Sequence, residues 1–462
     1  MNNFQLSEQA DPNKIFLTKF SELEGRFDPN TYHPIRRNAI NKIINSKFNY
    51  QILRELSDFS KKTTKHIDNN VYIGLENIES NTGIFIKSKE RENISSAIVF
   101  KKGQVLFPKL RPYLNKVHYA NFDGICSTEF HVLDSEYLNN KFLAYFLSLE
   151  IVVKQTTLLM SGNTLPRLQT EDIKNLLIPI PSEKIQADIV EKMDKAYQDK
   201  KDKETQVQKL LDSIDKYLLD ELGIDFPKQT DNSLKARIFT KKFSEVAGGR
   251  LDPDYHKPIY SVIDSALNNS KYEITNLDNI SNNIFQGVGR NLTENTMHIL
   301  LKVKNIAKNN EIRFDDVEYI DLYNNNKIKI LKSGDIISPF IGEAIKQYKF
   351  SVFPELSKKY TVDNNTGVIR LFECANPIFI SAFLMSFYGR KQIDRQLGGG
   401  GVPFIGTNGI KQLKIPLPPL EKQNQIAKRI SKIRDQAKQL QTEAKNGLEQ
   451  AKHEVEIMIL KR

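Results

Sequence analysis

The chain of 462 residues carries 67 lysines and arginines against 56 aspartates and glutamates, which gives a net charge of +11. A hydrophobic content of 39% and a charged content of 27% exclude a disordered chain, and no apolar run is long enough to cross a membrane. The basic balance favours a polyanionic partner, because lysine and arginine release condensed counterions where they meet phosphates.

The two cysteines, Cys126 and Cys374, lie in different parts of the chain. A structural disulfide is therefore not expected, and we predict a cytoplasmic location. The first residues lack the apolar core of a signal peptide, which agrees with that location.

The sequence contains a long duplication. The segment 20–33, which includes Phe20-Ser21-Glu22-Leu23 and Tyr32-His33, returns at residues 243–256. Residues 161–181 also match residues 398–418 without a gap, and their prolines are in phase. Solenoid repeats are only about 20–50 residues long. This longer repeat therefore indicates a whole domain with its connector, present twice, which suits a ligand with two half-sites.

Residues 1–181 predict a first domain of mixed α+β structure. Strands are expected at 71–75, 97–100 and 104–107, which are short apolar runs bounded by glycine and polar residues. Residues 139–153 have the spacing of one helix, with several large apolar residues on one face.

Residues 182–223 predict one long amphipathic helix. Ser182 is a suitable N-cap after Pro181, and Gly223 is a suitable residue just beyond the C-terminus. Apolar residues recur at steps of three and four on both sides of a polar stretch. The expected seam residues of this helix are Ile189, Met193, Val207, Leu211, Ile214 and Leu218.

Residues 224–418, which begin with a linker at 224–238, predict a second domain that repeats the first. Residues 334–337 match residues 103–106, and residues 377–388 are expected to form an apolar helix. The domain is therefore also expected to be α+β.

Residues 419–462 predict a second long helix with the apolar stripe of a coiled coil. Its expected seam residues are Ile426, Ile430, Ile433, Ala437, Leu440, Ala444, Gly447, Ala451, Val455 and Met458. Each long helix has about 40 residues and is about 60 Å long at 1.5 Å per residue. We expect the two to pair antiparallel, as a ruler between two domains. The alternative is that each helix packs only on its own domain.

No sequence motif indicates catalysis. A G-x-x-x-x-G-K-[ST] loop is absent, so ATP is not expected to bind. Asn376-Pro377-Ile378-Phe379 lacks the second proline of an amino-methyltransferase motif and is better explained as a helix start. The glycines at 398–401 lack the strand-to-helix context of a nucleotide site. His33 and His256 have no neighbours at ligand spacing, so we expect them to cap or pack, and no metal site is predicted.

Candidate contacts to a polyanion such as DNA are basic and amide residues near turns, because lysine and arginine meet phosphates while arginine, lysine, asparagine and glutamine read base edges. In the first domain the candidates are Lys87, Lys89, Arg91, Lys109, Arg111, Lys116 and Arg167. In the second domain they are Gln286, Arg290, Lys302, Lys304, Lys346, Lys349, Lys358 and Lys359, with Arg390 and Arg395 as further members. For each residue the alternative is a solvated surface charge.

The starts of the two long helices resemble a known family. Residues 178–190 (IPIPSEKIQADIV) and 415–430 (IPLPPLEKQNQIAKRI) are similar to the conserved-region signature of Type I restriction–modification specificity subunits. The first copy departs from the pattern, with Ser182 in place of a proline and Ile185-Gln186 in the Glu-Gln region. The resemblance extends over nearly the whole chain, in the order domain, helix, domain, helix.

This resemblance implies two tandem α+β target-recognition domains with pseudo-twofold symmetry, separated by two long antiparallel coiled-coil helices, and no catalytic centre. Each domain would read one half of a bipartite, asymmetric target in double-stranded DNA. The helices would set the spacer and dock two adenine-N6 methyltransferase subunits, and motor–nuclease subunits would complete the restriction enzyme. No cofactor is expected on this chain, whereas S-adenosylmethionine, ATP and Mg are expected on the partner subunits.

Three alternatives stay open at this point. A specificity protein of a Type II-like methylase–nuclease system would share the same architecture. A twin-domain scaffold protein would lack salt-dependent, sequence-selective DNA binding. A self-sufficient nuclease, built from scattered aspartates and glutamates, would cleave DNA alone in the presence of a metal ion.

Overall fold

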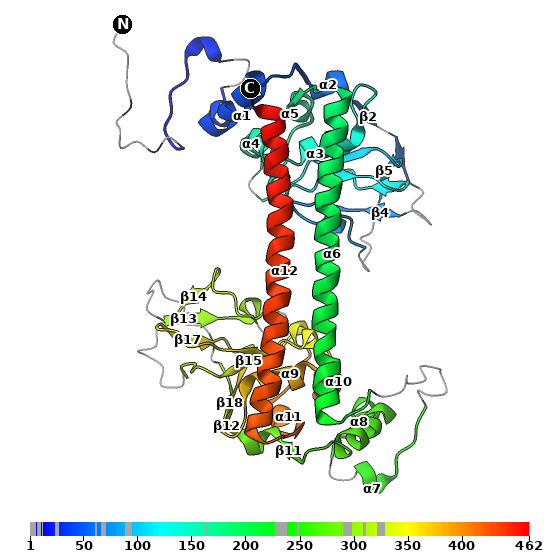
Figure 1. Cartoon of the computed structure of the whole chain (residues 1–462), viewed down its shortest axis with the longest axis vertical. Helices are drawn as coiled ribbons and strands as arrows, with labels where there is room; N and C mark the ends of the chain where they lie inside the picture. The colour runs from blue at the N-terminus through cyan, green and yellow to red at the C-terminus, as the bar shows by residue number, and fades with distance from the viewer. Residues whose placement is uncertain are drawn as a thin grey trace. The chain divides into compact units, whose positions relative to one another are not determined.

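The computed structural model divides the chain into two compact units. The first unit comprises residues 1–202 and 443–462, and the second comprises residues 203–442. The structure describes residues 6, 11, 13–23, 27–60, 62–65, 71–87, 95–162, 164–226, 238–246, 249–287, 289, 298–307, 311–320 and 329–461. Each unit contains a mixed α+β domain and segments of two long helices, α6 (Glu183–Leu222) and α12 (Leu420–Leu460) (Figure 1).

In its described residues, the first domain contains two four-stranded sheets, the two-stranded pair β1–β10 and five α-helices. The helices are α1 (Pro34–Ile44), α2 (Leu53–Leu56), α3 (Asn140–Leu147), α4 (Glu150–Thr156) and α5 (Thr170–Lys174). The strands are β1 (Tyr50–Ile52), β2 (Asp58–Ser60), β3 (Thr63–Thr64), β4 (Tyr72–Ile73), β5 (Ala97–Phe100), β6 (Val105–Pro108), β7 (His118–Tyr119), β8 (Gly124–Cys126), β9 (Phe130–Asp134) and β10 (Leu177–Pro179). One sheet has the antiparallel order β2-β9-β6-β7. The other has the order β3-β5-β8-β4, with β4 parallel to β8.

The second domain repeats this plan with a different partition of strands. The helices are α7 (Phe243–Val246), α8 (Pro258–Asn268), α9 (Pro377–Met385), α10 (Phe387–Gln396) and α11 (Thr407–Lys411). The strands are β11 (Ile274–Asn276), β12 (Ser281–Gln286), β13 (His298–Leu301), β14 (Glu318–Tyr319), β15 (Ile336–Pro339), β16 (Ser351–Val352), β17 (Lys359–Val362), β18 (Thr366–Leu371) and β19 (Lys414–Pro416). The sheet orders are β12-β18-β15-β16 and β14-β13-β17, with β13 parallel to β17.

The duplication seen in the sequence is also present in the backbone. In the first domain β1 pairs antiparallel with β10, so that Tyr50 lies opposite Pro179. In the second domain β11 pairs with β19 in the same way, and Ile274 lies opposite Pro416. The two in-phase prolines therefore occupy the same place in equivalent strand pairs, which lead directly into α6 and α12.

The strands expected in the first domain are present, with one shortened. Strand β5 covers residues 97–100 as predicted, and β6 begins one residue late, at Val105. The strand expected at 71–75 ends at Ile73, because the chain turns into a 3-10 helix at Leu75–Asn77. The Asn77 side chain fixes this turn by accepting a hydrogen bond from the Gly74 N–H at 2.8 Å.

The prediction of one helix over residues 139–153 is wrong, because the chain breaks into α3 and α4 with a bend of 64°. Asn115, which is distant in sequence, donates from Nδ2 to the Ser148 carbonyl oxygen at 2.7 Å. The Ser148 hydroxyl donates to the Tyr145 carbonyl oxygen at 2.7 Å. These bonds use the last acceptors of α3 and end it.

The helix expected at 377–388 breaks in the same way, at Ser386 between α9 and α10. The Phe387 N–H donates to the Asp215 carboxylate on α6 at 3.1 Å, so it is not available to continue α9. The Ser386 hydroxyl donates to the Phe383 carbonyl oxygen at 2.7 Å. Both units therefore interrupt an apolar helix at a serine, and contacts from elsewhere in the same unit favour the break.

Within each unit, segments of α6 and α12 lie side by side and run antiparallel (Figure 1). In the first unit Lys192 forms an ion pair with Glu454. Tyr197 lies further along α6, where burial and the charge of Glu449 raise its pKa, and Glu449 is earlier in α12. In the second unit Lys422 pairs with Glu221 at 2.6 Å. Helix α6 ends at Leu222, directly before the expected stop at Gly223, which has φ +68°, and the Ile224 N–H donates to the Leu219 carbonyl oxygen.

The seam of the long helices contains most of the expected residues and some that were not expected. The buried members are Ile189, Met193, Val207, Ile214, Leu218, Ile426, Ile430, Ile433, Ala437, Ala444, Ala451 and Val455, whereas Leu211, Leu440 and Met458 are half-buried. The prediction of Gly447 is wrong, because it is exposed and Leu448 is buried in its place. From Ala444 the buried stripe advances by four residues to Leu448, where a step of three residues to Gly447 was expected. This longer step shifts the stripe around the helix.

Among the described residues, no single helix is both long and apolar enough to span a membrane. The bent pair α3–α4 has a suitable composition, but its apolar residues form part of the buried core of the first unit. Packing inside the domain therefore accounts for this apolar segment.

Candidate nucleic-acid interface

Both domains carry the same loop arrangement after their central strand, β6 or β15. In the first domain the Arg111 N–H donates to the Pro166 carbonyl oxygen at 2.8 Å, and the Leu168 N–H donates to the Lys109 carbonyl oxygen at 2.9 Å. In the second domain the Gly342 N–H donates to the Pro403 carbonyl oxygen at 2.8 Å, and the Ile405 N–H donates to the Phe340 carbonyl oxygen at 2.9 Å. Equivalent strands are therefore joined to equivalent loops, which contain Pro166 in the first domain and Pro403 in the second.

Each proline loop is itself closed by a pair of backbone hydrogen bonds. Ser161 and Arg167 exchange two N–H to carbonyl bonds, as do Gly398 and Phe404. Gly162 and Gly399 lie just inside these pairs, with φ of +94° and +93°. The closing hydrogen bonds and the glycine conformation are thus the same in both domains, while the closing residue is an arginine in one and a phenylalanine in the other. We call these loops, residues 161–167 and 398–404, the proline loops.

The turn that faces each proline loop has an unusual backbone. Arg111 and Asn115 have φ of +49° and +48°, and Tyr348 has φ of +48° at the corresponding end of its turn. Such left-handed conformations at residues other than glycine cost about 1–3 kcal/mol and often occur at functional sites. The Asn115 side chain holds the first turn through its bond to Ser148. A fixed backbone beside an exposed Arg111 is suited to presenting a side chain to a ligand.

Several predicted DNA contacts in the first domain are held by the protein itself. Lys109 Nζ donates to the Thr128 carbonyl oxygen and Lys116 Nζ to the Leu75 carbonyl oxygen, both at 2.7 Å. Burial lowers the pKa of both lysines, and the nearby Glu129 opposes this shift at Lys109. Arg167 pairs with Glu129 at 2.6 Å. Lys87 and Arg111 are exposed, whereas Lys89 and Arg91 lie outside the described residues.

The second domain shows a similar division among its predicted contacts. Lys302 pairs with Glu318, Lys304 with Asp316 at 2.7 Å, and Lys346 with Glu343 at 2.9 Å. Lys358 and Lys359 are exposed, and Gln286 and Lys349 are half-buried. Arg290 lies outside the described residues. Arg390 and Arg395 connect parts of the unit, because they pair with Asp215 at 2.9 Å and Asp264 at 2.8 Å.

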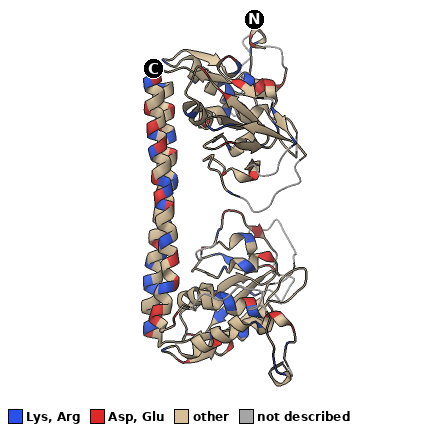
Figure 2. Cartoon of the chain, turned by 90° about the vertical axis from the view of Figure 1, so that its right-hand side faces the viewer, with Lys and Arg blue, Asp and Glu red and all other residues tan. Residues whose placement is uncertain are grey.

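Of the predicted contacts that are not in one of these pairs, Arg111 and Lys87 in the first domain and Lys358 and Lys359 in the second are exposed. Figure 2 shows lysine and arginine interspersed with aspartate and glutamate along the long helices, so the positive charge is not confined to one stretch of them. The described parts of the two domains supply separate basic positions, close to strand ends and turns.

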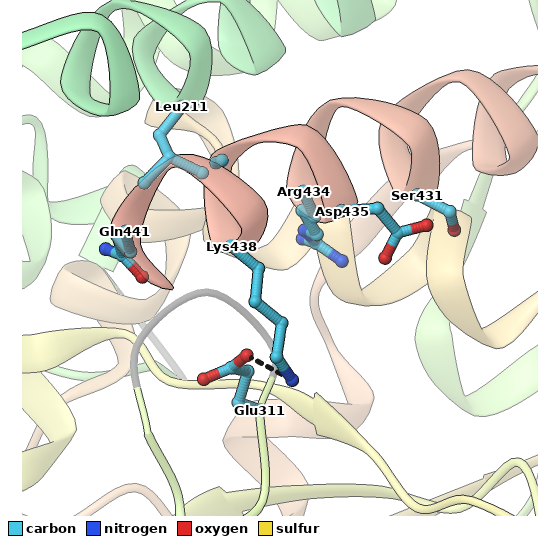
Figure 3. A pocket seen from close by; sticks show the side chains of 8 residues that line it. Leu211, Glu311, Ser431, Arg434, Asp435, Lys438 and Gln441 are labelled. Atoms are coloured by element: carbon cyan, nitrogen blue, oxygen red, sulfur yellow. Dashed lines mark ion pairs between the residues drawn. The ribbon is translucent and has the colours of Figure 1, made fainter. Parts of the chain in front are cut away.

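In both domains an acidic residue of an equivalent turn pairs with a lysine of a long helix. Glu79 lies 3.5 Å from Lys200 on α6, and Glu311 lies 3.0 Å from Lys438 on α12. The second pair lies at a pocket of about 180 Å³ that Arg434 also lines (Figure 3). Burial lowers the pKa of Arg434 to about 10. Each domain is thus attached to the adjacent helix segment by polar contacts.

The expected roles of two histidines and of one asparagine are confirmed. The His33 Nδ1 accepts from the Ile35 N–H at 3.2 Å and caps α1, while the His256 ring lies 2.5 Å from the Arg250 carbonyl oxygen. Asn376 caps α9 by accepting from the Ile378 N–H at 2.9 Å, so Asn376-Pro377 is a helix start. Within the described ranges, no group of three or more histidine, cysteine or acidic residues is arranged to hold a metal ion.

Sequence reasoning missed one repeated contact at the base of each long helix. Gln186, which is buried, accepts from the Asn139 N–H at 2.9 Å and donates to the Pro181 carbonyl oxygen at 2.9 Å. Gln423 makes the same two bonds with Asn376 and Pro418, each at 2.8 Å. The signal was present in the sequence, because the two glutamines are in phase within the duplicated connector.

The fold and the repeated loops define a class of protein in which a mixed α+β domain followed by a long helix occurs twice in one chain. The chain matches the family of Type I restriction modification DNA specificity domains over residues 53–212 and 256–450. These two matches cover more than half of the chain, and the chain belongs to this family. Membership confirms the resemblance to Type I specificity subunits that the sequence indicated.

Individual relatives agree with this assignment. The Type I restriction enzyme EcoDI specificity subunit from Escherichia coli is 25% identical over 181 residues, which are 36% of this chain and 40% of that protein. The MjaVIII specificity subunit from Methanocaldococcus jannaschii is 29% identical over 167 residues, 35% of this chain and 38% of that protein. These alignments therefore span well under half of each relative.

A solved structure shares the fold over most of the chain. It concerns complex assembly and conformational transition of the type I R-M system, and one of its chains matches with a TM-score of 0.51 and 18% identity. The match covers 89% of this chain and 96% of that chain. The architecture of domain, helix, domain, helix is thus shared with a chain of nearly equal extent.

Proposed function

We propose that this chain is the DNA sequence-specificity subunit of a Type I restriction–modification complex. Each domain reads one half of a bipartite, asymmetric target in double-stranded DNA. The observation that carries the proposal is the duplicated proline loop, which has the same backbone hydrogen bonds in both domains but different side chains. A shared scaffold with different exposed groups is what two readers of unlike half-sites require.

The two domains carry different side chains at equivalent positions of the loop arrangement. Arg167 in the first loop is replaced by Phe404 in the second, and Arg111 at the facing turn is replaced by Gly342. An arginine donates to phosphates or to guanine, whereas phenylalanine and glycine supply no such donor side chain. The two domains are therefore expected to prefer different base sequences.

The long helices are proposed to set the spacer between the half-sites and to dock two adenine-N6 methyltransferase subunits. Each unit buries a narrow apolar stripe between antiparallel segments of α6 and α12 and leaves a mixed-charge outer face (Figure 2). Such a face is available for helices of a partner. S-adenosylmethionine, ATP and Mg would be bound by the methyltransferase and motor–nuclease subunits of the complex.

The decisive experiment is methylome sequencing of cells with and without the gene. We expect one bipartite adenine-methylation motif to disappear when the gene is deleted and to return when it is restored. Exchange of residues 239–418 for the matching domain of a relative should change only one half of that motif. A methylome that does not change on deletion would contradict the proposal.

A further inference from the structure

Arg167 closes the proline loop of the first domain, and its backbone is held from two sides. It exchanges two N–H to carbonyl hydrogen bonds with Ser161, each 2.9 Å long, and it forms a β-bridge with Leu110, which follows β6. The next residue, Leu168, donates its N–H to the Lys109 carbonyl oxygen at 2.9 Å. The loop therefore fixes the point from which the Arg167 side chain extends.

The guanidinium of Arg167 is held as well, by one carboxylate. Its Nη2 donates to Glu129 Oε1 at 2.6 Å, while the arginine side chain is 51% exposed. A guanidinium has five N–H donors, and within the described part of the chain Glu129 is the only acceptor that binds the Arg167 side chain. The other donors are therefore available to a ligand, and the held side chain loses little further freedom when that ligand binds.

The second domain shows that the loop does not require this ion pair. The Asn365 carbonyl oxygen accepts at 2.9 Å from the N–H of the residue after β15, as the Glu129 carbonyl oxygen does at 2.8 Å from the residue after β6. Asn365 is thus equivalent to Glu129, and Phe404 is equivalent to Arg167. The second loop is closed by the same backbone bonds without either charge. Closing the loop therefore does not explain the pair in the first domain.

The charges around Arg167 favour a base edge over a phosphate as its partner. Glu129 offsets the charge of the guanidinium, which weakens its attraction to a phosphate but leaves its N–H donors able to bind neutral acceptors. Guanine presents two such acceptors, O6 and N7, in the major groove, and a pair of bonds to them is the commonest specific contact of arginine. The exposed Arg111 has no carboxylate partner among the described residues, so it is better suited to a phosphate.

We propose that Arg167 reads a guanine in the half-site of the first domain, and that Glu129 is a positioning residue that orients the guanidinium toward this base. The inference rests on the proposed function and deepens it, because it names one base and the residue that reads it. Phe404 supplies no donor side chain at the equivalent position of the second domain. The contact to guanine therefore belongs to one half-site only.

The test is a band-shift titration of the full chain, in complex with its methyltransferase subunits, on duplexes that carry the motif found by methylome sequencing. The exchange of residues 239–418 assigns each half of that motif to a domain. Each guanine, on either strand, is replaced in turn by 7-deazaguanine, which lacks the N7 acceptor. For the wild-type complex, replacement of one guanine in the first half-site should weaken binding about fivefold or more.

Two variants separate the reading residue from the positioning residue. Arg167→Phe copies the residue of the second loop, and it should bind the unmodified duplex about fivefold or more weakly and no longer respond to that one replacement. Glu129→Gln keeps the size of the side chain and removes its charge. It should reduce the preference for guanine over 7-deazaguanine a few-fold at the same position and leave the second half-site unchanged. An unaltered preference in Glu129→Gln would contradict the positioning role.

The matched control is Arg54→Gln, because Arg54 is 50% exposed and also faces a glutamate, Glu171, at 4.0 Å. It should leave every preference unchanged, and circular dichroism should show that all variants fold. A preference for guanine that persists in Arg167→Phe would overturn the inference. So would an equal loss of affinity for all duplexes, which is typical of a phosphate contact, or a first half-site without guanine on either strand. If the wild-type complex showed no sequence preference, the proposed function would fail instead.

Discussion

Gln186 and Asn139 are joined by a hydrogen bond of 2.9 Å from the Asn139 backbone N–H to the Gln186 side-chain oxygen. Asn139 caps α3, and Gln186 lies in the first turns of α6, so the bond connects a domain helix to a long helix. Gln423 and Asn376 form the equivalent bond in the second unit. The glutamine in each connector is thus a structural link between a recognition domain and a long helix.

We predict that Gln186→Leu and Gln423→Leu each lower the free energy of unfolding by about 1–3 kcal/mol, because buried backbone groups lose their partners. Urea denaturation of the full chain measures this change. The control is Gln198→Leu on α6, where the exposed side chain donates to Asp202. Its effect should stay within about 0.5 kcal/mol. Equal effects at Gln186 and Gln198 would contradict the assigned role.

A buried ion pair is expected to stabilise the second domain. Arg370 donates through Nε and Nη2 to both oxygens of Asp335, each at 2.7 Å, and Asp335 is 1% exposed. Asp335→Asn should lower the free energy of unfolding by about 3–5 kcal/mol, because it leaves a charge without its partner. Asp316→Asn, in the exposed pair with Lys304, should cost no more than about 1 kcal/mol. Thermal or urea unfolding of both variants tests this difference.

We expect His131 to make the stability of the chain depend on pH. Burial, aided by the charges of Lys109 and Lys174, lowers the pKa of His131 to about 4. Because the unfolded chain binds this proton at a higher pH, stability should fall as the pH drops from about 6.5 to about 4. His131→Gln should show a shallower fall over that range, as measured by urea midpoints at each pH. An identical pH profile in the variant would exclude this contribution.

The second proline loop should be sensitive to substitution at one glycine and tolerant at the next. Gly399 has φ +93°, and an added Cβ would lie 2.2 Å from the Val402 carbonyl oxygen, whereas Gly400 has no atom within 4 Å of that position. Gly399→Ala should therefore reduce DNA affinity at one half-site several-fold, while Gly400→Ala should not. Band-shift titrations with each half-site altered in turn measure this. Loss of affinity in both variants would contradict this difference, because any substitution in the glycine run at 398–401 would then weaken binding.

Insertion of one heptad into α6 or α12 should alter the permitted spacer or abolish activity while each domain still folds. A heptad adds about 10 Å of helix, which changes the distance between any two features that the helix connects. Methylome sequencing of cells that carry the insertion would show the new spacer, and circular dichroism would report folding. An unchanged spacer preference would refute the role of the helices as a ruler.

Patterns in the sequence determined the duplication, the α+β class and the two long helices with the stop at Gly223. Those features are local: helical periodicity, a C-terminal glycine and repeated phrases act through neighbouring residues. Most buried positions of the long helices were predicted on both sides of residue 448, but the step from Ala444 to Leu448 was not, because a buried position depends on the surface that faces the helix.

Only the tertiary structure decided where the apolar helices bend and which basic residues are exposed. Ser148 ends α3 because Asn115, 33 residues away, takes its carbonyl oxygen. Lys109 and Arg111 look alike as candidates in the sequence, yet one ammonium is held by the Thr128 carbonyl oxygen and the other side chain is exposed. Charge is a property of the residue, whereas its partner is set by long-range contacts of the folded chain.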